Sequence, residues 1–142
     1  MPTQRQAIMH FDGIIAPPPP TVSVNVTPIT LTSYIAAQNA VGVDCRISEG
    51  SFYCLVPGPY LVLFNLSFTF SDAQLFSAYI YVNDMMTPFG SHTWGLTSLR
   101  SSMSVMGLLD LHQDDKVNIK VASIINGQIL TIYDSHFIIV ST

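Results

Sequence analysis

Two cysteines are the first residues of this sequence that could do chemistry. Cys45 and Cys54 bracket the stretch R-I-S-E-G-S-F-Y, and a two-residue hairpin turn at Glu49-Gly50 would place them opposite each other. Their α-carbons would then lie about 4.5 Å apart, a separation that a disulfide accepts. Two reduced, buried thiols are the alternative. With no histidine nearby in the sequence and no helix N-terminus expected, the pair predicts architecture rather than nucleophilic catalysis.

Histidines and carboxylates form no local motif of metal or acid–base chemistry. The four histidines are far apart and lack H-x-x-H spacing: His10, His92, His112 and His136. Asp110, Asp114 and Asp115 are an alternative calcium cluster, but loop glycines and further carboxylates at calcium spacing are missing. The sequence also shows no Gly-rich phosphate loop and no Ser-His-Asp arrangement. It therefore predicts a protein that is not an enzyme and has no metal or cofactor.

One aromatic stretch is a candidate binding site. Phe89, His92 and Trp94 fall within the Gly-flanked segment P-F-G-S-H-T-W-G, which predicts a loop. Exposed there, the three side chains would form a contact site for a glycan or a protein. Anchoring of the same side chains in the core is the alternative.

Composition narrows the classes of protein. The chain has 142 residues, enough for one domain, with 49% hydrophobic and only 10% charged residues and a net charge of −4. Five scattered Lys and Arg residues argue against nucleic-acid binding. No apolar run approaches the roughly 18 residues of a membrane span, and no signal-peptide pattern is seen at the start. We therefore expect much of the surface to be buried against sister chains.

A period of two dominates the chain after residue 20 and predicts strands. The first 20 residues lack this period and end in Pro17, Pro18, Pro19 and Pro20, a stiff spacer that predicts an anchoring tail, with a proline-recognition ligand as the alternative. Residues 21–142 are predicted to form a single head domain. Its candidate strands indicate an all-β sandwich or barrel: 60–70, 76–82, 102–111, 116–123, 128–133 and 136–141.

A spaced motif runs through the second half of the predicted hairpin and the corner after it: Gly50, Phe52, Cys54, Pro57, Gly58 and Tyr60. It resembles the pattern Gly-x-Phe-x-Cys-x-x-Pro-Gly-x-Tyr of the globular head of complement component one-q. Weaker resemblances follow downstream, where Asp84 and Asp114 stand in turn positions that the family gives to glycine. The second replacement predicts a less tight turn. The resemblance covers residues 29–142 and extends to the superfamily that includes tumour necrosis factor.

The resemblance implies a two-sheet jelly roll that assembles as a homotrimer. It makes Tyr79, Tyr81, Phe137 and Ile139 candidates for subunit contacts, because their strands are apolar on both faces. The alternative is that these four side chains fill a larger core.

Departures from the family point away from a secreted animal protein. The sequence has no collagen-like Gly-X-Y stalk and no basic ligand-binding patch. A head with a short tail fits a virion surface protein better: a spike, a minor capsid protein or a decoration protein. Its tail would bind another capsid or coat protein, and its head would be free to contact a host receptor or glycan. A trimeric module of a bacterial surface or spore coat is the alternative.

Overall fold

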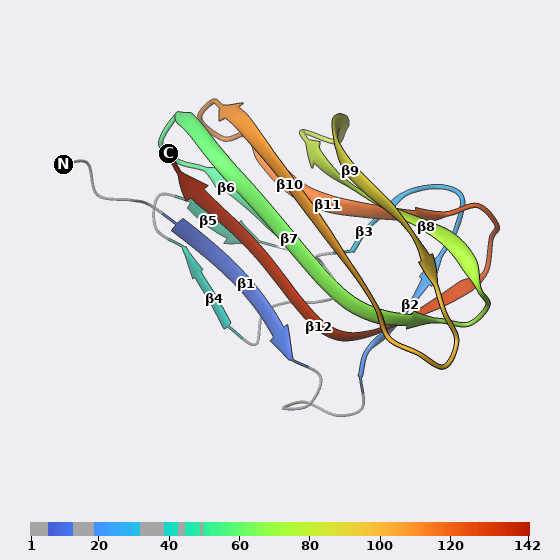
Figure 1. The fold of residues 1–142 in the computed structure, drawn as a ribbon. Helices are drawn as coiled ribbons and strands as arrows, with labels where there is room; N and C mark the ends of the chain where they lie inside the picture. The colour runs from blue at the N-terminus through green and yellow to red at the C-terminus, as the bar shows by residue number, and fades with distance from the viewer. Residues whose placement is uncertain (1–5, 13–18, 32–38, 43–44, 49) are drawn as a thin grey trace.

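The protein is a sandwich of two antiparallel β-sheets (Figure 1). A computed structural model describes residues 6–12, 19–31, 39–42, 45–48 and 50–142, and for residues 6–12, 39–42 and 46–47 it describes the backbone alone. The described residues contain strands and turns but no helix, so none of their elements is a helix long enough to cross a membrane.

The first sheet, sheet A, contains six strands in the order β10-β7-β12-β1-β4, with β2 pairing beside β12. The longest strands, β7 and β12, lie next to each other at its centre. The strand bounds are β1 Gln6–Asp12, β2 Thr21–Val24, β4 Asn39–Gly42, β7 Gly58–Phe70, β10 Ser101–Leu111 and β12 Gln128–Ser141.

The second sheet, sheet B, also contains six strands, in the order β5-β6-β11-β8-β9, with β3 pairing beside β11. Its strand β9 is an edge strand. The strand bounds are β3 Ile29–Thr30, β5 Cys45–Ser48, β6 Ser51–Cys54, β8 Gln74–Val82, β9 Met85–Gly95 and β11 Lys116–Ser123.

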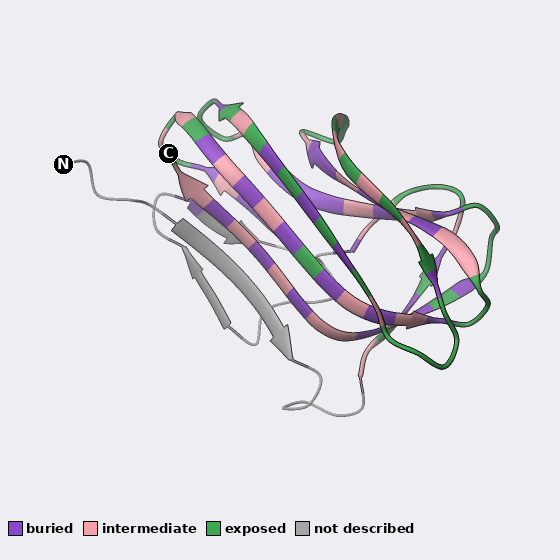
Figure 2. Cartoon of the chain, viewed as in Figure 1, coloured by how far each residue is buried: buried purple, intermediate pink, exposed green. Residues whose placement is uncertain are grey.

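One core lies between the two sheets, and aromatic rings from both sheets meet in it. Phe137 of β12 packs against Phe52 of β6 with ring centroids 4.6 Å apart, and Phe68 of β7 packs against Phe76 of β8 at 5.0 Å. All four rings are fully buried. Burial alternates residue by residue along β7, β10 and β12 (Figure 2), as expected for strands with one face in the core.

The complement-like motif is architectural. The hairpin pairs Cys45 with Cys54 as its predicted register requires, and Gly50 adopts a positive φ of 76° in the turn. At the Pro-Gly-Pro corner the Tyr60 hydroxyl donates to the carbonyl of Val56 at 2.6 Å, and the Cys54 thiol donates to the same carbonyl at 3.1 Å. The corner is therefore held by side chains of the motif itself.

Two aspartates take over turn positions where the resemblance expects glycine. Asn83 and Asp84 have φ values of 51° and 64° and connect β8 to β9 by a two-residue turn that pairs Val82 with Met85. Asp114 reaches a φ of 67° before β11. Asn and Asp tolerate this left-handed region better than most residues, so the tight geometry is kept. The expected loosening of the turn at Asp114 is wrong.

The structure corrects three predicted boundaries. Residues 6–12, predicted as part of a tail, form β1 inside sheet A, paired with both β12 and β4. The two strands predicted at 128–133 and 136–141 are one strand, β12, with an irregularity between Ile132 and Asp134. The predicted loop 88–95 belongs to β9, because an edge strand tolerates Pro88.

Candidate functional site

The face of sheet A that points away from the core is arranged in four rows of cross-strand neighbours. Each row takes one residue from β10, one from β7 and one from β12. We call the first two the apolar rows, Leu108–Leu61–Val140 and Met106–Leu63–Ile138. We call the next two the polar rows, Ser104–Asn65–His136 and Ser102–Ser67–Asp134. Polarity on this face therefore changes from one end of the strands to the other.

The apolar rows expose large side chains to water. Met106 is 63% exposed and Leu108 62%, while the β7 and β12 members are half-buried. Strands β7, β10 and β12 contain no Lys or Arg. A contiguous apolar surface without cations is a surface that a partner covers in many soluble proteins.

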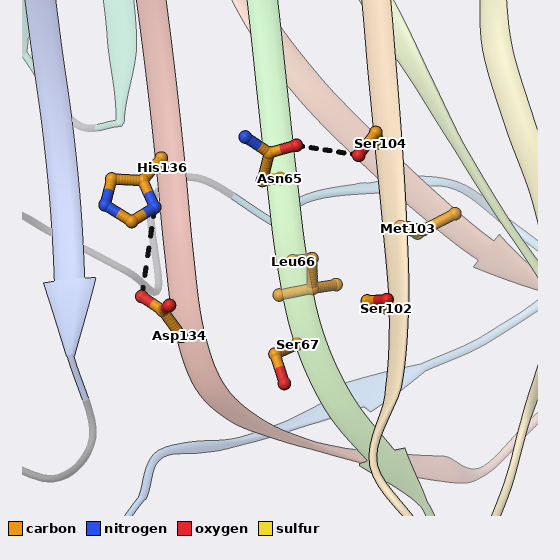
Figure 3. A pocket seen from close by; sticks show the side chains of 8 residues that line it. All are labelled: Asn65, Leu66, Ser67, Ser102, Met103, Ser104, Asp134 and His136. Atoms are coloured by element: carbon orange, nitrogen blue, oxygen red, sulfur yellow. Dashed lines mark hydrogen bonds and ion pairs between the residues drawn. The ribbon is translucent and has the colours of Figure 1, made fainter.

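The polar rows surround a small hollow of about 180 Å³ (Figure 3). Within it the Ser104 hydroxyl donates to Asn65 Oδ1 at 2.7 Å, and His136 Nδ1 lies 3.9 Å from Asp134 Oδ1. Figure 3 shows the His136 and Asp134 side chains projecting from the same strand, β12, toward each other. The hollow can take water or a small polar ligand, and its lining includes a carboxylate and an imidazole.

The outward face of sheet B is organised by charge. The Asp84 carboxylate forms ion pairs with Lys116 Nζ at 2.9 Å and with Lys120 Nζ at 3.3 Å. The Lys120 ammonium also lies 5.0 Å from the centroid of the Tyr81 ring. The hydrogen bond from Lys116, with that from Lys120, lowers the pKa of Asp84. Burial raises the pKa of the Tyr81 hydroxyl. The charges of Asp84, Lys116 and Lys120 are therefore paired within one chain.

A second cluster on sheet B joins β8 to β9. The Tyr79 hydroxyl and His92 Nε2 are 2.7 Å apart and share a hydrogen bond. The Tyr79 ring lies over Gly90, its cross-strand partner, so that an added Cβ at Gly90 would come within 2.1 Å of the ring. A glycine on an edge strand is thus covered by a neighbouring aromatic side chain.

The four predicted subunit contacts do not form one surface. Tyr79 and Tyr81 lie on sheet B, whereas Phe137 and Ile139 lie on β12 of sheet A. Phe137 and Ile139 are 0% exposed and belong to the core of a single chain. Their assignment to a subunit interface is wrong, because the residues of β12 that face inward beyond Asp134 are the odd-numbered ones. Ile138 and Val140 occupy its outward face instead.

The predicted ligand loop is also divided by the structure. His92 and Trp94 lie on the exposed side of β9, where Trp94 is 58% exposed. Phe89 has the opposite parity and packs against the core, directly over Gly107 of β10. A shared contact site of Phe89, His92 and Trp94 is therefore wrong, and the remaining pair is His92 and Trp94.

The cysteines are buried and are not joined by a disulfide in this structure. Burial raises the pKa of the Cys54 thiol, which disfavours the reactive thiolate. A bond formed under oxidising conditions stays a prediction. Pro17 and Pro18 of the predicted spacer lie outside the described residues, while the Pro20 carbonyl accepts a hydrogen bond from Ile132 at 3.0 Å. Among the side chains that are described, no three metal-binding groups come together.

Sequence reasoning missed the apolar rows. Both faces of the strands that carry them are rich in apolar residues, so alternation alone does not tell which face points inward. Two exposed residues of β10, Met106 and Leu108, would have been a usable signal, because they alternate with Val105, Gly107 and Leu109, which are buried or partly buried.

Comparison with known proteins supports the fold. No family model matches the chain, and no curated protein matches it. The globular domain of zebrafish complement 1qA protein is similar over 95% of this chain and 94% of its own, at 15% identity and a TM-score of 0.60. Murine APRIL, solved at pH 5.0, is similar over 97% of this chain and all of its own, at 13% identity and a TM-score of 0.59. The predicted jelly-roll fold of the complement one-q and tumour necrosis factor type is confirmed.

Proposed function

We propose that this chain is a non-enzymatic head that assembles as a homotrimer through the outward face of sheet A. The observation that carries the proposal is the pair of apolar rows, whose Met106 and Leu108 are more than 60% exposed in the single chain. Covering them with a sister copy removes apolar surface from water, at about 25 cal/mol per Å². The fold resemblance, which implies a trimer, supports the same arrangement.

The outward face of sheet B remains accessible in this arrangement. Its ion pairs are satisfied within the chain, so no partner is needed to neutralise them. The exposed Trp94 next to His92 gives this side of the head an aromatic contact for a receptor or glycan. Even if each contact site binds its receptor or glycan weakly, several sites in each trimer and many trimers on each particle would raise the overall affinity.

We place the trimer on the surface of a virus particle. In support, only 10% of the residues are charged, against about 25% in a typical soluble domain, and such a deficit is expected of a chain whose surface is covered by other subunits. Labelling of intact particles by an antibody to the head would establish this location. Labelling of bacterial envelopes or spores, with unlabelled particles, would replace it by a cellular coat.

The assembly is tested by one substitution on each sheet. Met106→Asp puts a charge into the apolar rows, while Met86→Asp is the matched control on sheet B, where Met86 is 57% exposed. We expect the natural chain and the control to sediment at three times the chain mass of 15.6 kDa, and Met106→Asp as a monomer. A natural chain that sediments as a monomer, or a Met106→Asp trimer, would overturn the proposal.

A further inference from the structure

Two turns that are far apart in the sequence are tied together by a pair of asparagines. Asn25, just after β2, accepts a hydrogen bond on its side-chain oxygen from the Gly127 N–H at 2.9 Å. Asn126, just before β12, accepts one from the Val26 N–H at 3.0 Å. Both turns lie at the end of the sandwich opposite the C-terminus (Figure 1). Each asparagine thus holds the backbone of the other turn, and we call the arrangement the asparagine clamp.

The clamp contains the only Asn-Gly pair of the sequence, Asn126-Gly127. An asparagine followed by glycine is the dipeptide most prone to spontaneous deamidation, because glycine has no side chain to keep its backbone nitrogen away from the asparagine carboxamide. Both residues are exposed, so water reaches them. The dipeptide therefore has the composition and the solvent access that deamidation requires.

Deamidation at this dipeptide needs no reactant other than water and its hydroxide ion. The Gly127 nitrogen loses its proton to hydroxide and attacks Cγ of Asn126, so that a new C–N bond closes a succinimide ring. The bond from Cγ to Nδ2 breaks, and the amide leaves as ammonia after taking a proton from water. A second water molecule opens the ring at one of its two carbonyls and leaves aspartate or isoaspartate. No electrons are transferred to or from the chain.

The clamp holds both groups that would react. The Gly127 N–H points to Asn25 Oδ1, and this hydrogen bond must break before the nitrogen can approach Cγ of Asn126. The Asn126 carboxamide must likewise leave the Val26 N–H. A backbone hydrogen bond from the Ser123 N–H to the Asn25 carbonyl, at 2.9 Å, ties the same two turns once more. Ring closure therefore requires a local opening that separates the turns.

We propose that Asn126 is a latent modification site, whose deamidation is suppressed by the asparagine clamp and begins when the two turns separate. Isoaspartate lengthens the main chain by one methylene, which would move Gly127 and Gln128 out of register with their partners Asn25 and Val24. The clamp could then not close again, so the modification would be a permanent record of opening. None of these residues belongs to the apolar rows, and the site is therefore independent of the proposed trimer.

Incubation of the full chain at mildly alkaline pH, followed by trypsin and mass spectrometry, tests the site. The tryptic peptide 121–142 contains Asn126 as its only asparagine, so its gain in mass reports this one reaction. We expect the folded chain to react at least about tenfold more slowly than the chain unfolded in guanidinium, because two hydrogen bonds must break first. Asn25→Ala, which removes one of them, should react about fivefold faster than the natural folded chain. Thr27→Ala, an exposed position in the same turn, is the matched control and should react at the natural rate.

Equal rates in the folded and unfolded chains would overturn the proposal, and so would a natural rate in Asn25→Ala or a rate as fast as that variant's in Thr27→Ala. Because Asn25→Ala could also loosen the whole fold, amide exchange of the central strand β7 is measured in the same samples. Faster deamidation with β7 still protected supports the clamp, whereas faster deamidation that accompanies faster exchange in β7 overturns it. Asn25→Asp keeps an oxygen acceptor for the Gly127 N–H and should react at about the natural rate; a rate like that of Asn25→Ala would count against the hydrogen bond.

Discussion

The outward faces of the two sheets differ in how their side chains are satisfied. On sheet B, Asp84 is paired with two lysines and Tyr79 with His92, all within one chain. On sheet A, the apolar rows have no cation along their strands and leave Met106 and Leu108 exposed. The charged groups of one face are thus paired within the chain, and the other face is the one that the proposed trimer would cover. Under that proposal, the difference separates the surface that assembles from the surface that stays accessible.

The largest expected loss of stability comes from a substitution on the inward face of β12, and a substitution on its outward face is the comparison. Phe137→Ala removes a fully buried ring that contacts Phe52, and should lower the free energy of unfolding by about 3–5 kcal/mol. Ile138→Ala, one residue later on the outward face, should cost the monomer less than about 1 kcal/mol and weaken the trimer. Urea unfolding of dilute chains and sedimentation measure the two quantities. Equal losses of monomer stability would contradict an outward-facing Ile138.

A substitution on sheet B should change stability without changing assembly. Gly90→Ala places a Cβ where the Tyr79 ring now lies, and displacement of that ring should cost about 1–3 kcal/mol. The melting temperature would fall while the sedimented mass stays that of the natural chain. A change in mass would show that sheet B also takes part in assembly.

Acid should weaken the face that is organised by charge. Two lysines lower the pKa of Asp84; for Asp115, burial acts to raise the pKa but is outweighed by hydrogen bonds from the His112 N–H and the Asn83 amide, which lower it. These carboxyls ionise more easily in the folded state, so their contribution is complete above their ordinary value of 3.8 and is lost as pH falls below it.

Melting temperature measured from pH 7 to pH 2 tests this dependence. We expect little change above pH 5 from these two groups and a decline below about pH 4. The double substitution of Asp84 and Asp115 by Asn should make the decline shallower. An unchanged slope in that variant would assign the acid sensitivity to other carboxyls.

Salt should give the smallest effect and act differently on the two faces. Raising ionic strength to 1 M shortens the screening length to about 3 Å and weakens exposed ion pairs such as Lys116–Asp84, which contribute little to stability. Burial of the apolar rows does not depend on charge, so the trimer should persist. Sedimentation at low and high salt checks this, and dissociation at high salt would indicate an ionic interface.

Local features of the fold could be predicted from sequence, because short-range geometry determines them. The register of Cys45 with Cys54 follows from a two-residue turn, and the buried face of β7 follows from its even-numbered apolar residues. The assignment of Phe137 to an interface failed because Ile138 and Val140 are equally apolar. Hydrophobicity cannot choose between two such faces; the packing against Phe52 of the other sheet does.

Long-range pairing accounts for most of what the sequence concealed. The segment Gln6–Asp12 is short and half polar, and its partner β12 lies at the other end of the chain. Ile8 interrupts the alternation of apolar and polar residues in this segment, so no clear period of two marked it as a strand. The stretch around Trp94 was predicted as a loop because it contains a proline and glycines. The edge strand β9 accommodates these residues, and the Tyr79 ring covers Gly90.

The placement of β1 beside β12 also has a mechanical consequence. The strands are antiparallel with Gln6 opposite Val140, so the first strand begins where the last one ends. Pulling these two ends apart would peel the strands from each other one residue pair at a time, at low force. Pulling Gln6 against the opposite end of the sandwich would load all seven pairs in shear at once. A protein held at Gln6 and pulled at the opposite end of the sandwich would therefore resist mechanical unfolding better than the short length of β1 suggests.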